Sequence, residues 1–562
     1  MLEKKHKGLL ISDFTIDNLA GLLNNDDELP IVETSTIPFG QVMPVLLDEN
    51  HQCWRKKYDF ALVWTRPQAV IKQFEDFLCY KKINIEEMLK QVDEYCSALS
   101  NLSQRVRFCF VPSWVIPLYH RGFGMLETKP SIGLTNILMQ INLRLFENVS
   151  HLPNIYTLDA QRWVALVGKK AFNPKLWYMG KIAFSNEVFI EAVKDIKASI
   201  RGLTGQAKKL IIVDLDDTLW GGIVGDDGWE NLRLGGHDYI GEAYVDFQRA
   251  LKSLTNRGIL LGIVSKNEEK IALEAIEKHP EMVLKLDDFA GWKINWNDKA
   301  QNIVELVEEL NLGLQSVCFL DDNPVERARI REALPEVFVP ELPQDKTLYA
   351  STLLNLRCFD KPSLSSEDFI RTQMYISERK RKDLQKKIGS VSDWLKTLDI
   401  KVKIEPLKTS NLERVIQLLN KTNQMNLTTR RMTETELLEW VRQKKRKIWT
   451  LRVLDKFGDY GLTGILSVEI NGNKGRIVDF VLSCRVMGRK VEETMVNIAY
   501  KYAKSAGVDE LYAKYIPTKK NKPCFDFWKK SGFTYNEDTN IFFWDMKKNY
   551  PLPDCVKVEL ND

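Results

Sequence analysis

The stretch from Lys209 to Gly222, Lys-Leu-Ile-Ile-Val-Asp-Leu-Asp-Asp-Thr-Leu-Trp-Gly-Gly, constrains the fold of this chain more than any other. Four apolar residues, Leu210 to Val213, precede carboxylates at Asp214, Asp216 and Asp217. A short apolar run bounded by a turn predicts a buried parallel strand, and open parallel sheets bind ligands at the carboxyl ends of their strands. Because clustered carboxylates repel one another and oxygen ligands suit Mg²⁺, the stretch predicts a magnesium site. An acidic turn that caps the following helix is the alternative.

This segment resembles the first motif of the haloacid dehalogenase (HAD) superfamily, Asp-x-Asp-x-Thr/Val after an apolar strand. The resemblance implies that Asp214 is the nucleophile that accepts a phosphoryl group and that Asp216 is the general acid and base. A carboxylate nucleophile forms an aspartyl-phosphate and so divides one difficult displacement into two easier ones. Asp216 would protonate the leaving oxygen and then activate water or another acceptor.

A HAD site also requires a hydroxyl and a lysine at the ends of further elements. Ser265 ends an apolar run that begins at Gly258, and it supplies the hydroxyl. Lys299 opens a helical pattern with one apolar face, while Lys293 in the preceding loop is a competing candidate. The lysine would offset the charge of the phosphate and of the nucleophile.

Further acidic ligands follow a third apolar run that starts at Ser316 and ends in Asp321 and Asp322. By the family's pattern Asp322, rather than Asp321, binds Mg²⁺ together with Asp214 and the backbone carbonyl of Asp216. Both residues of the pair remain candidates from the sequence. The elements occur in the order that a HAD domain requires, which is far more specific than the first motif alone.

The chain leaves no room for a folded cap domain between the first motif and Ser265. Glycine-rich loops at Gly225 to Gly228 and Leu234 to His237 lead into a helix expected around Gly241 to Asn256. A site without a cap is open, so a large acceptor or a neighbouring domain could reach it.

Length and composition limit the class of protein. A chain of 562 residues is too long for one hydrophobic core, so several domains are expected. A net charge of +4, from 80 basic and 76 acidic side chains, provides no overall field for nucleic acid. Nine cysteines without a Cys-x-x-Cys pair argue against zinc and disulfides and favour a reducing cytoplasm. Without a signal peptide or an apolar stretch of about 18 residues, neither secretion nor membrane spanning is expected.

The longer string that begins at Asp214, Asp-Leu-Asp-Asp-Thr-Leu-Trp-Gly-Gly-Ile-Val-Gly-Asp-Asp-Gly, resembles the FkbH-like proteins of HAD subfamily IIIC. Leu-Asp-Asp-Asn-Pro-Val-Glu-Arg from Leu320 and the segments Lys421 to Arg431 and Leu482 to Arg489 also resemble that family, across most of residues 175–545. The resemblance implies that the protein takes a glyceryl group from 1,3-bisphosphoglycerate and removes phosphate. It then loads the group as a thioester onto the phosphopantetheine arm of an acyl carrier protein, for polyketide or related biosynthesis.

A second α/β pattern follows a charged helical connector. Runs at Lys447 to Leu454, Leu462 to Ile470 and Gly475 to Val481 predict antiparallel strands, with Asn471-Gly as a hairpin turn. The sequence after them, Arg-Val-Met-Gly-Arg, opens a helix predicted from Val491 to Ala503.

That turn resembles the pyrophosphate loop of GNAT N-acyltransferases. The resemblance implies that Arg485, Gly488 and Arg489 bind the phosphates of coenzyme A or phosphopantetheine at a helix N-terminus. The last glycine of the family's pattern is Lys490 here, which argues for a GNAT-like fold without a working acetyl-CoA site.

Cys484 lies between the last strand and this helix and is flanked by two arginines. A helix N-terminus and guanidinium groups lower the pKa of a thiol. Because the FkbH-like family keeps a cysteine here, we expect Cys484 to hold the glyceryl thioester in transit. A buried structural cysteine is the alternative, and Cys524 is a second candidate.

The N-terminal region shows strands at Tyr58 to Thr65 and Val106 to Pro112, separated by a long amphipathic helix expected around Ile71 to Leu99. Its placement resembles the SGNH-hydrolase-like domain of long FkbH-type proteins. The Gly-Asp-Ser motif and the Asp-x-x-His pair of those hydrolases are absent. We therefore expect a docking or structural domain without catalysis, with the carrier protein as a candidate partner.

The predicted fold class is α/β with several domains. The expected parts are an SGNH-like domain at 1–205, a capless HAD domain with a Rossmann-like parallel sheet at 206–360, a helical connector at 361–399, a GNAT-like α+β domain at 400–548 and a tail at 549–562. The predicted function is a Mg²⁺-dependent cytoplasmic glyceryl transferase and phosphatase. The alternatives are a plain HAD phosphatase with a GNAT-like binding domain, an acyltransferase to an amino sugar, and a non-catalytic scaffold.

Overall fold

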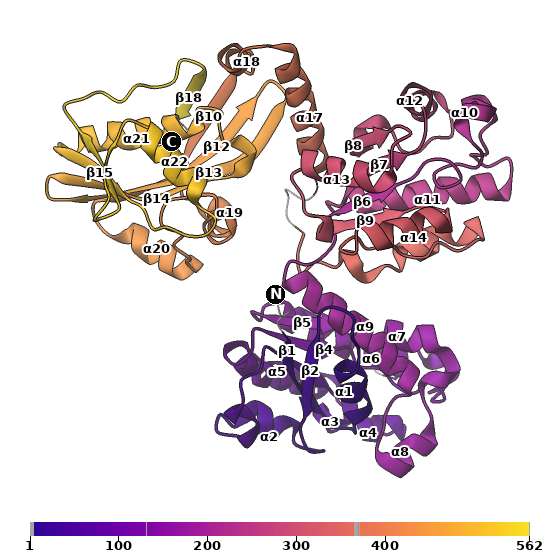
Figure 1. Ribbon diagram of the computed structural model, residues 1–562. Coiled ribbons are helices and arrows are strands. Elements are labelled where there is room, and N and C mark those ends of the chain that lie inside the picture. Colours follow the sequence, from indigo (N-terminus) through magenta and orange to yellow (C-terminus); the bar gives the residue numbers. More distant parts are fainter. Residues whose placement is uncertain (1–4, 131, 365–368, 370, 561–562) are drawn as a thin grey trace. The chain divides into compact units, whose positions relative to one another are not determined.

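The computed structural model describes residues 5–130, 132–364, 369 and 371–560. The chain divides into two compact units, Met1–Lys208 with Asn355–Ser363, and Lys209–Leu354 with Leu364–Asp562. The first unit contains one sheet and the second contains two (Figure 1). In the part of the chain that is described, no helix is both long and apolar enough to cross a membrane.

The first unit is an open parallel sheet of five strands in the order β2-β1-β3-β4-β5. The strands are β1 (His6–Ser12), β2 (Val32–Thr36), β3 (Phe60–Trp64), β4 (Phe108–Pro112) and β5 (Ile155–Leu158). The two strands predicted from the sequence are confirmed as β3 and β4. Every residue of both strands is buried, as expected for a parallel sheet that is covered on two faces.

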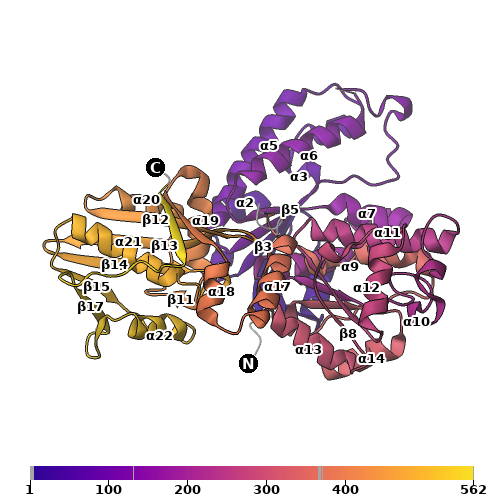
Figure 2. The ribbon, with the colours of Figure 1, turned by 90° about the horizontal axis from the view of Figure 1, so that it is seen from above.

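Helices cover both faces of this sheet. One apolar core contains residues of α2, α4, α5 and α6, and the other contains residues of α1, α7 and α9; Figure 2 shows α5 and α6 side by side. The helices are α1 (Asp17–Asn24), α2 (Val42–Leu47), α3 (Pro67–Val70), α4 (Phe74–Leu78), α5 (Ile85–Ser100), α6 (Leu134–Ser150), α7 (Ala160–Val167), α8 (Pro174–Gly180) and α9 (Asn186–Leu203).

The prediction of a single long helix around Ile71 to Leu99 is wrong, because α4 ends at Leu78 and a new helix, α5, starts at Ile85. Tyr80 takes a left-handed φ of 60° after α4 ends. The side chain of Asn84 then accepts hydrogen bonds from the backbone N–H groups of Glu86 and Glu87, and so caps a new helix. The apolar periodicity continues across the break, which is why it predicted one helix.

The first unit also contains a segment from later in the chain, residues 355–363. A 3₁₀ turn at Arg357–Phe359 places the Arg357 guanidinium against Glu191 and Asp195 of α9. The backbone N–H of Lys208 donates to the carbonyl of Cys358 at 2.8 Å. The chain therefore leaves the first unit at residue 208 and returns to it at residue 355.

The second unit begins with a four-stranded parallel sheet in the order β8-β7-β6-β9. Its elements are β6 (Leu210–Val213), α10 (Val224–Asp227), α11 (Tyr239–Thr255), β7 (Leu260–Ser265), α12 (Glu269–Lys278), β8 (Phe289–Ile294), α13 (Lys299–Glu309), β9 (Val317–Leu320), α14 (Pro324–Ala333) and α15 (Tyr349–Leu354). The buried strand predicted from Leu210 to Val213 is confirmed as β6, and the predicted helices are confirmed as α11 and α13. Residues 214–259, all of which are described, hold only α10, a 3₁₀ turn and α11, so no cap domain is inserted there.

The charged connector forms α17 (Arg371–Lys387) and α18 (Val391–Thr397). Part of the predicted connector, residues 365–368 and 370, lies outside the described residues. The Arg381 side chain is 2% exposed and pairs with the buried Asp455, at 2.6 Å from Nε to Oδ2. This ion pair ties α17 to the sheet that follows.

The second sheet of this unit has the strand order β16-β17-β15-β14-β13-β12-β10-β18, and a short strand β11 pairs with β14. Its strands are β10 (Ile400–Pro406), β11 (Met425–Asn426), β12 (Arg446–Asp455), β13 (Gly458–Asn471), β14 (Lys474–Leu482), β15 (Glu510–Lys514), β16 (Thr534–Asn536), β17 (Ile541–Asp545) and β18 (Val556–Leu560). The predicted antiparallel strands and hairpin are confirmed as β12, β13 and β14.

Helices α19 to α22, together with α18, pack on this sheet. Residues of α21 and α22 belong to the larger apolar core, and residues of α19 and α20 belong to a second core. The helices are α19 (Thr409–Lys421), α20 (Glu434–Arg442), α21 (Val491–Ser505) and α22 (Lys522–Lys530). The helix predicted to follow the Arg-Val-Met-Gly-Arg turn is therefore present as α21.

The segment expected to be a C-terminal tail contributes a strand instead. Strand β18 pairs in parallel with β10, with Ile400 opposite Val556. Without β18 the backbone of β10 would be an open sheet edge, so the pairing satisfies its hydrogen-bonding groups. Pro551 and Pro553, which precede this short strand, are typical of a loop and hid the strand from pattern analysis.

Candidate active site

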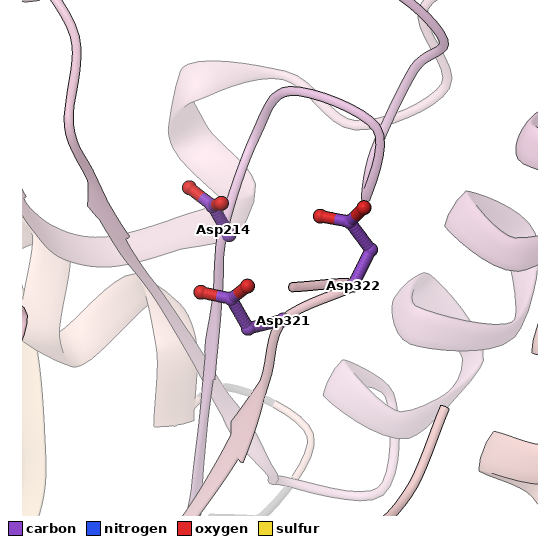
Figure 3. A group of neighbouring side chains, drawn as sticks. All are labelled: Asp214, Asp321 and Asp322. Carbon is purple, nitrogen blue, oxygen red and sulfur yellow. The ribbon is translucent and has the colours of Figure 1, made fainter. Parts of the chain in front are cut away.

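Three aspartates meet at the carboxyl ends of two neighbouring strands. Asp214 follows β6, Asp321 and Asp322 follow β9, and one ligand oxygen from each lies within 4.8 Å of the others. Val213 is paired with Leu320 in the parallel register, which places the residues that follow them side by side (Figure 3). The cluster therefore forms at the sheet edge where the sequence predicted a metal site.

Lys299 joins two of these carboxylates. Its Nζ lies 2.8 Å from Oδ2 of Asp214 and 2.6 Å from Oδ2 of Asp321. The Lys299 side chain is 4% exposed. Burial alone would lower the pKa of Lys299, but the two carboxylates raise it above its usual value. The competing Lys293 instead donates to Glu309 of α13 at 2.7 Å.

Asp321 is fully buried and accepts a hydrogen bond from Lys299. Its pKa is raised to about 6, because burial penalises the charged form and the neighbouring Asp214 repels it, against the attraction of Lys299. Oδ1 of Asp321 accepts a hydrogen bond from the backbone N–H of Asn323 at 2.9 Å. Both oxygens of this carboxylate are thus occupied by protein donors.

Asp214 and Asp322 have the donors that a divalent cation requires. Oδ1 of Asp214 is buried and has no hydrogen-bond partner among the described residues. A buried carboxylate oxygen without a donor is costly unless a cation binds it. The side chain of Asp322 is 24% exposed, and its Oδ1 lies 3.3 Å from the Thr218 hydroxyl. This oxygen-only set fits Mg²⁺, with the carbonyl of Asp216 as a further predicted ligand.

Asp216 is held in place by three donors. Its Oδ1 accepts from Nε1 of Trp220 at 2.9 Å and from the backbone N–H of Val224 at 3.1 Å, and its Oδ2 accepts from Nδ2 of Asn267 at 2.8 Å. Burial, reinforced by the charge of Asp214, raises the pKa of Asp216 above its usual value. A raised pKa suits a carboxyl group that holds a proton before transferring it.

Ser265 is the last residue of β7 and is buried at the same sheet edge. Strand β7 pairs in parallel with β6, and Ile263 is opposite Val213. The hydroxyl of Ser265 therefore lies on the strand next to Asp214, as expected for a group that holds a phosphoryl oxygen. Asn267, which orients Asp216, follows two residues later.

Lys346 is a member of the site that sequence analysis missed. Its Nζ donates to the carbonyl of Asp217 at 2.9 Å and lies 3.4 Å from Oδ2 of Asp322. The Tyr244 hydroxyl donates to the same Asp217 carbonyl at 3.2 Å. Asp217 has a left-handed φ of 53°, and these two donors hold its turn. No motif or periodicity marks Lys346 in the sequence.

The other predicted residues lie on the second sheet of this unit, at the end of β14 and the start of α21. Cys484 is exposed and free. The Arg485 guanidinium contacts Ser483 and Met374, and the Arg489 guanidinium binds Glu378 of α17. The structure thus gathers one group of predicted residues around Asp214 and a second group around Cys484.

Cys524, the second candidate thiol, is fully buried in α22. Burial raises its pKa to about 12, which keeps it in the unreactive thiol form. The position of Cys524 fits a structural residue of the apolar core, while the exposed Cys484 is open to a reaction partner.

No protein-family model and no curated protein matches the chain. Among solved structures, the N-terminal part of the protein BF1531 from Bacteroides fragilis, described as containing a phosphatase domain complexed with Mg, is 32% identical, with a TM-score of 0.57. The match covers 64% of this chain and 95% of that chain.

Two acetyltransferase structures match a smaller part of the chain. The spermidine N-acetyltransferase from Vibrio cholerae, in complex with CoA and spermine, is 16% identical with a TM-score of 0.22, and the match covers 26% of this chain and 96% of that chain. A GNAT-family acetyltransferase from Staphylococcus aureus is 11% identical with a TM-score of 0.21, and the match covers 26% of this chain and 99% of that chain.

Proposed function

Because the chain belongs to the same family as the phosphatase-domain protein BF1531, we propose that its aspartate cluster performs Mg²⁺-assisted phosphoryl transfer. The main support for the proposal is the different hydrogen bonding of the two Asp214 carboxylate oxygens. Oδ2 is held by the buried Lys299, and Oδ1 is buried without a partner among the described residues. This is the arrangement of an oriented nucleophile beside a cation site.

Asp214 attacks the phosphorus atom, and the bond from phosphorus to the leaving oxygen breaks. The positive charge of Lys299 offsets the charge of the phosphoryl group, and Asp216 gives its proton to the leaving oxygen. Asp216 then removes a proton from the water that hydrolyses the aspartyl-phosphate. Bound Mg²⁺, held by Asp214 and Asp322, would neutralise charge on the transferring group.

The finer proposal is that the chain acts as an FkbH-like glyceryl transferase. Asp214 takes the phosphoryl group of the C3 phosphate ester of 1,3-bisphosphoglycerate, which water then releases as phosphate. The Cys484 thiolate attacks the C1 acyl phosphate, so that the second phosphate leaves as the thioester forms. The thiol of the phosphopantetheine arm of an acyl carrier protein then takes the acyl group and releases Cys484. The exposed thiol of Cys484 and the absence of a cap over residues 214–259 support this proposal. The sequence resemblance provides the substrate and the partner.

The test is to incubate the protein with 1,3-bisphosphoglycerate and Mg²⁺ and to record phosphate release and intact mass. We expect a glyceryl adduct that is lost in Cys484→Ala and retained in Cys524→Ala, which is the matched control. Asp214→Asn should abolish release of the C3 phosphate. Phosphate release without any adduct in the wild type would contradict the transferase and leave a plain phosphatase. A requirement for an acyl-CoA would favour the amino-sugar acyltransferase.

A further inference from the structure

The parallel strands β14 and β15 separate after a short paired stretch. They pair only where Lys474–Ile477 lies beside Glu510–Ala513. Strand β14 continues to Leu482, paired with β13 along its other edge. The second half of its free edge has backbone groups that need partners. An extended ligand with amide groups is the kind of molecule that adds to such an edge.

The chain itself fills this edge. Strand β11 pairs with the end of β14 in antiparallel register. The backbone N–H of Leu427 then donates to the carbonyl of Phe480 at 3.2 Å, and the N–H of Ile516, just after β15, donates to the carbonyl of Leu427 at 3.0 Å. The segment 425–428 thus bridges the two diverging strands. Met425 is 2% exposed and Leu427 is 0% exposed, so the segment is part of the core.

Polar contacts fix the segment on both sides. The carbonyl of Asn426 accepts from Nδ2 of the buried Asn521 at 3.1 Å. Arg430 pairs with Asp479, whose side chain is 1% exposed, through two hydrogen bonds. Asp479 also accepts from the hydroxyl of Ser467. A ligand could enter between β14 and β15 only by breaking these contacts and exposing the apolar side chains.

The N-terminus of α21 is likewise occupied by the protein's own carboxylates. The backbone N–H of Gly488 donates to Oε1 of Glu492 at 2.7 Å, and the Glu492 side chain is buried. Nη2 of Arg489 lies 2.9 and 2.8 Å from the two carboxylate oxygens of Glu378. The Gly488 N–H and Nη2 of Arg489, which could bind a phosphate, therefore already have carboxyl partners.

Lys490 completes this internal arrangement. It has a left-handed φ of 64°, at the position where the GNAT pattern has its last glycine. Its ammonium group lies 2.7 Å from Oε1 of Glu493. The positive charge of Lys490, which replaces the glycine of the GNAT pattern, is thus paired with Glu493 of α21.

We propose that the C-terminal domain is closed to coenzyme A. The segment 425–428 takes the place of an extended pantetheine chain, and Glu492 and Glu378 take the place of its phosphates. The glyceryl donor and the phosphopantetheine arm of the proposed carrier protein then reach the exposed Cys484 without entering between β14 and β15. The proposal concerns binding alone, so it is independent of phosphoryl transfer at Asp214.

The test is equilibrium dialysis of the full chain with coenzyme A and with 3′,5′-ADP, which carries only the nucleotide phosphates. We expect the wild type to bind neither ligand with a Kd below about 1 mM. Glu492→Ala frees the Gly488 N–H and should tighten 3′,5′-ADP binding by about tenfold or more. Glu439→Ala removes an exposed acidic side chain from α20, which packs in a different core from α21, and should leave binding unchanged.

Saturable binding of coenzyme A by the wild type at micromolar concentration would overturn the proposal. Equal binding of 3′,5′-ADP by Glu492→Ala and Glu439→Ala would overturn the role of Glu492. Circular dichroism and thermal unfolding of each variant check that the chain is folded. Failure of phosphate release in the wild type would count against the proposed phosphatase and not against the closed C-terminal domain.

Discussion

Replacing Lys299 with methionine leaves two buried carboxylates without the cation between them. Lys299 is 4% exposed, and its Nζ lies within 2.8 Å of both Asp214 and Asp321. Removal of one partner of a buried ion pair costs about 3–5 kcal/mol, which is a large share of a domain's free energy of unfolding of about 5–15 kcal/mol. For a domain of about 150–250 residues this loss corresponds to a fall in Tm of about 6–20 °C.

Calorimetry of the full chain at pH 7.5 in EDTA measures this loss. At pH 7.5 both partners are charged, because the pKa of Lys299 is raised and that of Asp321 is about 6. The Lys299 contribution to stability is lost only above the pKa of a free lysine. Addition of Asp321→Asn to Lys299→Met should recover much of the Tm, because it removes one of the two facing charges. Mg²⁺ should also raise the Tm of the single variant.

Lys293→Met is the matched control for this experiment. Lys293 is 19% exposed and pairs with Glu309 at the surface, so its loss should cost no more than about 1 kcal/mol. Equal falls in Tm for Lys299→Met and Lys293→Met would refute the argument that a buried charge cluster surrounds Lys299.

Three further predictions concern other groups of the molecule. Burial raises the pKa of Glu492 from 4.5 to about 7. The free energy of unfolding should therefore fall by up to about 3 kcal/mol as pH rises through this range, and urea titrations at several pH values measure that fall. Glu492→Gln should remove this pH dependence. Asn267→Ala removes a donor from Asp216; kcat should fall by about tenfold or more, and the alkaline limb of the pH–rate profile should move upward, whereas an unchanged profile would refute the orienting role. Asp322→Asn should weaken Mg²⁺ binding in calorimetry by about tenfold or more, and undiminished affinity would exclude Asp322 as a ligand.

Local patterns were sufficient for elements whose partners follow soon in the chain. The apolar run at Leu210 to Val213 predicted β6, and the alternation around Asn471 predicted the hairpin of β13 and β14. The break at Tyr80 was not visible, because apolar periodicity is the same on both sides of it. Strand β18 was missed for another reason, since it depends on the open edge of β10, which lies far away in sequence.

The candidate site shows the same division. The positions of Asp214, Ser265 and Asp322 at the ends of successive apolar runs were sufficient to predict that these residues lie at one sheet edge. Lys293 and Lys299 could not be separated, because both flank the loop between β8 and α13 and only the packing of α13 directs one of them inward. Lys346 reaches Asp217 across 129 residues of sequence, so only the folded chain reveals it.

Because residues 355–363 belong to the first unit, that unit cannot be completed until late in translation. Asp195 accepts from Nε1 of Trp163 and pairs with Arg357, so one ionic partner of α9 is synthesised only after the whole four-stranded sheet of the second unit. During translation Glu191 and Asp195 therefore lack the guanidinium group of Arg357 until residues 209–354 have been synthesised. Synthesis from the N-terminus thus completes the inserted residues 209–354 before the last segment of the first unit is made.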